Sequence, residues 1–383
     1  MNKVINKQRI LIFIDWFAPG FKAGGPTTSN VNIVEHLKDK FDFYVMTTDT
    51  DYHEFQPYQN VVSDKWIKQN GFSVYHFSLG NLSFKALKKA VKEAACDTWY
   101  VNGIYSKYFS IYPLILAKMI HPRQVIVSAR GMLSPHALAI KSIVKKSYLV
   151  IARGLRFFDK VKFHATNEEE ADYIRLALGK NRMIDSVENL PRKVNLNSFA
   201  TRKDSTEIKL VSFARISPEK NTLYAIECLK YCKERVVYHI YGQINSMSYW
   251  KECEKVIKIL PDHVTVEYKG TVSPQEMSNI YKGYHFLYLP STGENFGHAI
   301  LESLMNSTPV IISDKTPWRC LVEKHVGWDL PLEDKQLFAS TIDKCARLSW
   351  EQYKVMVNKA CLYAKEVSEN PCVVQSYINL FTK

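Results

Sequence analysis

The chain is 383 residues long, 46% hydrophobic and 13% aromatic, and it carries a formal net charge of +13. This length exceeds the size at which one core keeps growing, so two domains are expected. No apolar run approaches the roughly 18 residues of a membrane span, and the run at residues 10–14 is too short for a secretory signal. The eight cysteines contain no Cys-x-x-Cys pair, which favours reduced core residues of a cytosolic protein.

The first half of the chain alternates short apolar runs with helical stretches. Runs rich in β-branched and aromatic residues, separated in this way, are typical of a parallel sheet with helices on both faces. In chain order, we expect strands at 8–15, 41–48, 98–105, 124–130 and 162–166, and helices at 26–39, at 109–120 and from 167 onwards.

The second half repeats the pattern and then becomes wholly helical past residue 330. Strands are expected at 208–214, 236–242, 264–270, 285–291 and 309–314. The joint at 188–207 has neither a strand nor a helix pattern and contains Pro191, as a linker should. We therefore predict an α/β protein with two doubly wound, parallel-sheet domains. The predicted boundaries are 1–195 and 196–365, with a C-terminal helix at 366–383 that packs back on the first domain.

The positive charge belongs mainly to the first half. Residues 1–195 hold 28 Lys and Arg against 17 Asp and Glu, whereas the remainder holds 23 against 21. A basic segment interleaved with apolar residues lies between 139 and 163, and such a segment can rest on anionic lipid. A surface helix with one buried stripe and solvated lysines explains it equally well. Nucleic acid is a weaker candidate, because no recognisable binding module accompanies the charge. The basic residues of the segment are Lys141, Lys145, Lys146, Arg153, Arg156, Lys160 and Lys162.

The most informative segment is 287–314, which reads LYLPSTGENFGHAILESLMNSTPVIISD. Its pattern predicts a buried strand, a glycine-containing loop, an amphipathic helix and a second strand. Glu294 lies in the loop, and Glu302 lies eight residues later, about two turns into the helix. A helix N-terminus that follows a strand is suited to phosphate, and a carboxylate nearby commonly accepts hydrogen bonds from ribose hydroxyls. The segment therefore predicts a nucleotide or nucleotide-sugar pocket.

Three blocks of the second half resemble glycosyltransferase family 4, the group 1 glycosyl transferases. FARISPEKN at 213–221 is similar to the family's Gly-Arg-x-x-x-x-Lys-Gly segment, and YKGTVSPQEMSNIY at 268–281 resembles its Gly-x-hydrophobic-x-x-x-Glu-hydrophobic segment. LPSTGENFGHAILESLMNSTPVIIS at 289–313 resembles its Glu-x7-Glu signature. The resemblance implies two facing Rossmann-like domains, an architecture known as GT-B. It also implies transfer of a sugar from a nucleoside diphosphate.

The resemblance also implies a role for individual residues. Arg215 and Lys220 would grip the donor diphosphate, Glu294 would lie beside the donor sugar, and Glu302 would bind the ribose. The loop and helix start between the two acids would complete the donor site through Asn295, Phe296, Gly297 and His298. Retention of anomeric configuration is likewise expected from the resemblance. Because cations and a helix N-terminus can replace a metal at the leaving group, we expect no metal and no cofactor.

The first half matches the family less specifically. Gly24 and Gly25 occupy the position of the family's glycine-rich first loop, which faces the donor phosphates and the acceptor. Where many members have a His-Gly pair, this chain has Arg130-Gly131. We assign no catalytic histidine, although Arg130 or the nearby His136 can be placed on the acceptor and sugar side.

Other functions are weighed against this one. Asp49-Thr50-Asp51 has the spacing of an Asp-x-Asp metal motif, but this spacing arises often by chance. A nucleotide-sugar epimerase or a phosphorylase shares the architecture, and a basic module for lipid or nucleic acid is the non-enzyme alternative.

We predict a cytoplasmic transferase, peripheral at the inner face of the membrane, that uses a UDP- or GDP-sugar. A hydroxyl of a glycan or lipid-linked acceptor in cell-surface polysaccharide synthesis (lipopolysaccharide, capsule or exopolysaccharide) would receive the sugar, without nucleic acid as a partner.

Overall fold

The computed structural model describes residues 7–139, 142–193 and 207–382, which form two compact units. Unit 1 comprises Met1–Leu190 and Pro371–Lys383, and unit 2 comprises Pro191–Asn370. Most of the expected linker, residues 194–206, lies outside the described residues. Within the described ranges, no helix has the length and apolar character needed to cross a membrane.

Unit 1 is built on an eight-stranded sheet with the order β3-β4-β2-β1-β5-β6-β7-β8. All neighbouring strands run parallel except β3, which pairs antiparallel with β4 at one edge. The chain reverses its direction of travel across the sheet between β1 and β5. The strands are β1 Arg9–Phe13, β2 Asp42–Thr48, β3 Trp66–Gln69, β4 Phe72–Phe77, β5 Thr98–Asn102, β6 Gln124–Ser128, β7 Val161–Ala165 and β8 Met183–Ser186.

Helices cover both faces of this sheet, because its strands carry apolar side chains on both faces. One core contains residues of α2, α3, α5 and α6, and the core on the other face contains residues of α1 and α13. The helices are α1 Gly25–Leu37, α2 Phe84–Ala94, α3 Tyr112–Ile120, α4 Pro135–Ala139, α5 Ser142–Gly154, α6 Glu168–Leu178 and α13 Pro371–Thr382, with a π-helical turn at Lys107–Ile111.

Strands β3 and β4 form a hairpin in a region where no strand is expected from the apolar pattern. The turn is Asn70-Gly71, and Gly71 has a φ of 89°. Asn-Gly between two runs of β-forming residues is a strong local hairpin signal, because both turn positions tolerate positive φ. This signal was available in the sequence, whereas the short strands β8 and β14 carry no comparable one.

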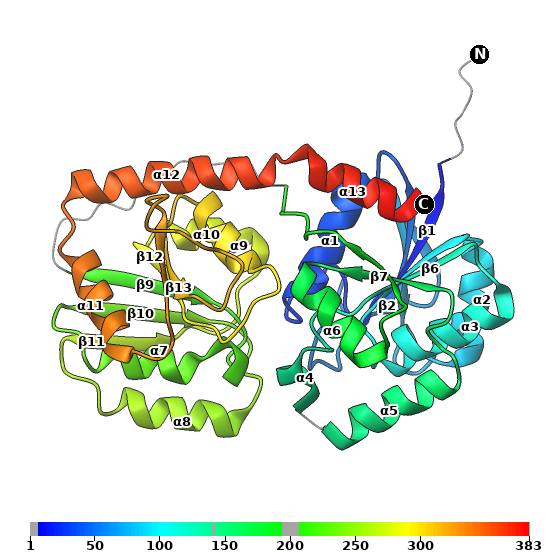
Figure 1. Ribbon diagram of the computed structural model, residues 1–383, viewed down its shortest axis with the longest axis horizontal. Helices are drawn as coiled ribbons and strands as arrows, with labels where there is room; N and C mark the ends of the chain where they lie inside the picture. Colours follow the sequence, from blue (N-terminus) through cyan, green and yellow to red (C-terminus); the bar gives the residue numbers. More distant parts are fainter. Residues whose placement is uncertain (1–6, 140–141, 194–206, 383) are drawn as a thin grey trace, which may run out of the picture. The chain divides into compact units, whose positions relative to one another are not determined.

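The C-terminal helix α13 belongs to the core of unit 1, although it follows unit 2 in the chain (Figure 1). The ring of Phe381 contacts those of Phe41, Phe43 and Tyr100, with centroid separations of 5.7, 6.1 and 5.7 Å. Gln8 donates a hydrogen bond from Nε2 to the carbonyl of Phe381 at 2.8 Å. The apolar face expected at the end of the chain is therefore covered by β1, β2 and β5.

Unit 2 is built on a six-stranded, fully parallel sheet with the order β11-β10-β9-β12-β13-β14. The strand order reverses between β9 and β12, which pair directly. One face is covered by α7, α8 and α11, the other by α9 and α10, and α12 contributes to both cores. The elements are β9 Ile208–Phe213, β10 Val236–Tyr241, β11 Val264–Tyr268, β12 Phe286–Leu289, β13 Val310–Ser313, β14 Gly327–Leu330, α7 Thr222–Leu229, α8 Met247–Ile257, α9 Pro274–Tyr281, α10 His298–Met305, α11 Lys335–Ala346 and α12 Trp350–Ser368.

The cysteines are all free thiols, but not all are core residues as the sequence analysis expected. Cys320 and Cys372 are exposed, and Cys361 is partly exposed, because they lie in a surface loop and on the outer sides of helices. The remaining five are buried.

Replacing Phe381 by Ala should destabilise unit 1 by about 3 kcal/mol or more, because the fully buried ring leaves a cavity against three aromatic neighbours. Equilibrium unfolding in urea measures the change. Phe55→Ala is the matched control, since the Phe55 side chain is exposed and its loss should change the unfolding free energy little. Equal effects of the two substitutions would contradict the packing assigned to α13.

Candidate active site

Two loops meet at the carboxyl edge of the unit 2 sheet, after the adjacent strands β9 and β12. The backbone N–H and the hydroxyl of Thr292 both donate to the carbonyl of Glu219, at 3.0 and 3.1 Å. Asn221 donates from its side chain to the carbonyl of Pro290 at 3.0 Å. A crevice at the point where strand order reverses is the usual ligand site of an open α/β sheet. These hydrogen bonds fix the two loops to each other at that point.

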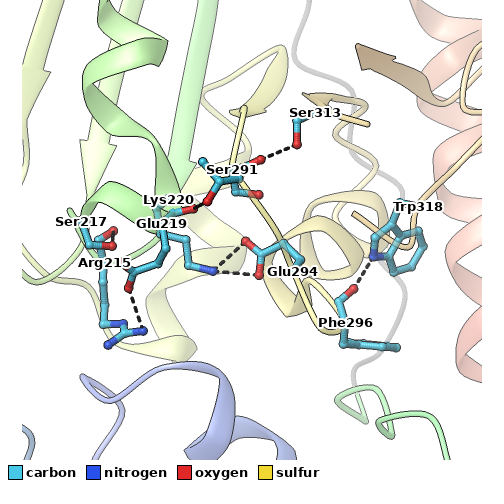
Figure 2. Close-up of polar contacts among 10 residues, drawn as sticks. Arg215, Ser217, Glu219, Lys220, Ser291, Glu294, Phe296, Ser313 and Trp318 are labelled. Atoms are coloured by element: carbon cyan, nitrogen blue, oxygen red, sulfur yellow. Dashed lines mark hydrogen bonds and ion pairs between the residues drawn. The ribbon is translucent and has the colours of Figure 1, made fainter. Parts of the chain in front are cut away.

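Arg215 and Lys220 both come from the loop after β9. Lys220 closes a short 3₁₀ turn, Pro218–Lys220, and Asn221 then adopts a left-handed conformation at the start of α7. This local geometry turns the Lys220 side chain towards the second loop, where its ammonium lies 2.6 and 2.8 Å from the two carboxylate oxygens of Glu294 (Figure 2). Arg215 pairs with Glu219 at 3.4 Å. Two cations and two carboxylates therefore lie within one pair of loops.

The start of α10 requires glycine at position 297. Gly297 has a φ of 81°, a conformation that side chains disfavour, and a Cβ there would lie 2.8 Å from Cδ1 of Ile300. The indole N–H of Trp318 donates to the carbonyl of Phe296 and holds the turn from outside (Figure 2). The resulting helix N-terminus, at His298, carries the partial positive charge that favours anions. Asn295 lies in the same loop between Glu294 and this helix.

Glu302 lies on α10 behind the loop. Burial raises the pKa of its carboxyl to about 7, and the guanidinium of Arg192 opposes this shift by favouring the ionised form. No hydrogen bond between described residues reaches its carboxylate oxygens. The neighbouring Tyr281 is buried and donates instead to the carbonyl of Ala299 at 3.3 Å. Glu302 is therefore a partly buried acceptor, which suits it to a ligand hydroxyl.

Gly24 and Gly25 lie after β1, at the corresponding reversal point of unit 1. Gly24 has a φ of 76° and precedes the first residue of α1, and a Cβ on either glycine would meet no atom within 4 Å. Open space at a helix N-terminus permits close approach of a ligand. The loop itself is held by Asp51, whose carboxylate accepts from the backbone N–H groups of Phe21 and Lys22 at 3.0 and 3.2 Å.

This contact gives the Asp-x-Asp sequence a structural explanation. Asp51 clamps the glycine loop, and Asp49 accepts a hydrogen bond from Ser63 at 2.7 Å. Over the part of the chain that the structure describes, no group of three or more His, Cys, Asp or Glu side chains is placed to hold a metal ion. Sequence reasoning missed Asp51 as a clamp, because its partners lie about 30 residues earlier in the chain.

Arg130 directs its guanidinium to groups of the protein itself. It donates to Asn102, Asn189 and Tyr100 at 3.0, 2.5 and 2.9 Å, and Tyr100 in turn hydrogen-bonds to the buried His164. These bonds tie the end of β5 to the segment that leaves unit 1. His136 falls in α4, and its side chain lies outside the described residues.

Comparison with known proteins shows similarity in sequence and in fold. Residues 194–361 match the family described as "Glycosyl transferases group 1". The solved structure of HepE from Anabaena, in complex with UDP and glucose, superposes with a TM-score of 0.68 at 17% identity, over 97% of this chain and 99% of HepE. Sucrose-phosphate synthase from Thermosynechococcus elongatus gives a TM-score of 0.70 at 14% identity, with 98% of each chain covered.

A third structure, WaaG, a glycosyltransferase involved in lipopolysaccharide biosynthesis, gives a TM-score of 0.61 at 12% identity, over 98% of this chain and 99% of WaaG. No curated protein sequence matches the chain. These structures share with this chain the two-domain GT-B fold. The sequence match to the group 1 glycosyl transferases lies within unit 2.

The raised pKa of Glu302 predicts a pH dependence of stability. Because the folded pKa of about 7 exceeds the ordinary value of 4.5, folding favours the protonated acid, and this stabilisation is lost as the pH rises from 4.5 through 7. Glu302→Gln, which stays neutral, should therefore gain on the order of 1–3 kcal/mol over wild type between pH 5 and pH 8. Urea unfolding at both pH values tests this. Glu366→Gln, on the exposed side of α12, should not gain stability relative to wild type over this pH range. If the difference in unfolding free energy between Glu302→Gln and wild type is the same at pH 5 and pH 8, the assignment is refuted.

Proposed function

We propose that the protein transfers a sugar, with retention of anomeric configuration, from a UDP- or GDP-sugar to a hydroxyl of a glycan or lipid-linked acceptor. The synthesis of a cell-surface polysaccharide is the process that we infer for it. One observation carries the proposal: the Lys220–Glu294 pair, Arg215 and the N-terminus of α10 all belong to the two loops that follow β9 and β12, where the strand order of unit 2 reverses. HepE, which shares the fold, was solved with UDP and with UDP-glucose, and this supports a nucleotide-sugar donor.

The charges of the site match the charge that develops in such a reaction. The bond between the anomeric carbon and the diphosphate breaks, and its electron pair stays on the phosphate oxygen. Stabilisation aimed at that oxygen accelerates the reaction, because the charge is greatest in the transition state. Arg215 offers a planar fork for phosphate oxygens, Lys220 a mobile point charge, and α10 the positive end of its dipole. We assign these three groups to the leaving diphosphate, in place of a metal ion.

The two acids then take the remaining parts of the donor. Glu294 would accept hydrogen bonds from sugar hydroxyls, and Glu302 from the ribose. The acceptor oxygen forms the new bond on the same face of the sugar, and its proton passes to the leaving phosphate oxygen. The open space at Gly24 and Gly25 fits an approach of the donor phosphates or the acceptor to unit 1. Arg130 would support the structure of unit 1 rather than bind a ligand, because its N–H groups already donate to residues of unit 1.

Donor binding should depend on Lys220 and not on a divalent metal. A thermal-shift screen with UDP, GDP and their sugars should raise the melting temperature of wild type by roughly 5–10 °C at 100 times the dissociation constant. Lys220→Met should lower this shift and reduce transfer at least about 100-fold, since it removes one preorganised charge. Lys344→Met, on the exposed side of α11, is the control and should match wild type. The metal-free assignment would be overturned if EDTA abolished donor binding by wild type while the Lys220→Met variant still bound the donor as wild type does.

We also propose that unit 1 contacts an anionic membrane surface through α5. Five large apolar side chains on or just after this helix have exposed fractions from 54% to 80%. The helical period puts them on one side, while Leu149 and Ala152 pack into the core from the other side. Lys146 and Arg153 are exposed beside them. Such a face gains both by apolar insertion and by attraction to anionic headgroups. The apolar residues are Ile143, Val144, Val150, Ile151 and Leu155; of the basic residues in this segment, Lys141 lies outside the described residues.

The double substitution Val150→Ser and Ile151→Ser should weaken binding to vesicles several-fold, because it removes two exposed apolar groups from the centre of this face. Co-sedimentation with vesicles of phosphatidylcholine containing phosphatidylglycerol measures the binding, and vesicles of phosphatidylcholine alone test the charge requirement. Leu176→Ser is the matched control, because Leu176 is even more exposed than Val150 and Ile151 but lies on α6. Unchanged sedimentation of the double variant would exclude α5 as the contact.

A further inference from the structure

The ion pair between Lys220 and Glu294 differs in its surroundings from the other ion pair of the same loops. The side chains of Lys220 and Glu294 are 19% and 10% exposed, and the ammonium contacts both carboxylate oxygens. Arg215 and Glu219 are 31% and 32% exposed and meet through a single longer contact of 3.4 Å. Removing one partner of a largely buried pair leaves a poorly solvated charge, whereas water readily replaces a partner of an exposed one. The Lys220–Glu294 pair is therefore the costly one to separate.

The backbone around this pair is held on both sides. The N–H of Lys220 donates to the carbonyl of Ser217 at 3.1 Å, and Thr292 and Asn221 join the two loops through Glu219 and Pro290. Farther along the second loop, the Trp318 indole fixes Phe296 (Figure 2). Any exchange of partners must therefore come from rotation of the two side chains, without withdrawal of either loop.

We propose that this pair makes the site select the intact nucleotide sugar over the free nucleoside diphosphate, an inference that rests on the proposed function. A diphosphate that draws Lys220 away leaves the Glu294 carboxylate without its cation. A nucleotide sugar supplies both replacements, with phosphate oxygens for Lys220 and sugar hydroxyls for Glu294. The free diphosphate supplies only the first. Once the sugar has been transferred, Glu294 recovers Lys220 and weakens the hold on the product.

Glu294→Gln tests this selection, because a neutral amide costs less to leave unpaired. Isothermal titration of UDP and UDP-glucose, and of GDP and GDP-mannose, gives the ratio of diphosphate to nucleotide-sugar dissociation constants. For the pair that wild type binds, Glu294→Gln should bind the diphosphate roughly tenfold more tightly and lower this ratio by at least as much. Glu219→Gln makes the same chemical change in the less buried pair, so its ratio should stay within about twofold of wild type.

A second variant keeps the test decisive if Glu294→Gln folds poorly. Glu294→Asp retains the charge but withdraws it from Lys220 by one methylene group, and it should give a ratio between those of wild type and Glu294→Gln. Unchanged ratios in both Glu294 variants, with wild type binding a donor, would refute the selection and leave the proposed function standing. Failure of wild type to bind any of the four ligands would overturn the proposed function itself, and the selection with it.

Discussion

The pairing of β9 with β12 is the constraint on which the site depends. It places two strands that are distant in the sequence side by side at the centre of the unit 2 sheet. Their carboxyl ends then bring the loop of Lys220 against the loop of Glu294, 74 residues later. Side-chain and backbone hydrogen bonds from Asn221 and Thr292 fix this approach. Without that register, the cationic and acidic residues would lie in unrelated loops.

Unit 1 uses its polar residues differently at the corresponding edge of its own sheet. Asp51 holds the backbone of the glycine loop, and Arg130 ties Tyr100 and Asn102 of β5 to Asn189. Asp51 and Arg130 thus form their hydrogen bonds within the protein. The carboxylate of Glu302 in unit 2, by contrast, accepts no hydrogen bond from the described residues. This contrast fits the proposed function, in which the charged groups of unit 2 bind the donor.

Charge in the site is balanced locally. Arg215 and Lys220, in the loop after β9, each pair with a carboxylate. A ligand phosphate must therefore replace these carboxylates as the partner of each cation. Exchange costs less at Arg215 and Glu219, whose side chains are about one-third exposed, than at the more buried Lys220 and Glu294. The cost of ligand binding is therefore set mainly by the separation of Lys220 from Glu294. A ligand with both phosphate and hydroxyl groups offsets this cost at both residues, and the proposed specificity follows from that.

The sequence by itself determined the parallel sheets, the glycine-containing loop after β12 and the position of Glu302 on the helix that follows it, because apolar periodicity and turn chemistry are local properties. The Asn70-Gly71 hairpin was equally local, although it was not recognised. Only the tertiary structure decided that Lys220 contacts Glu294, that Asp51 clamps a loop 30 residues away, and that Arg130 is used internally. These contacts depend on strand order and register, which join segments far apart in the chain and leave no periodic signal in either segment alone.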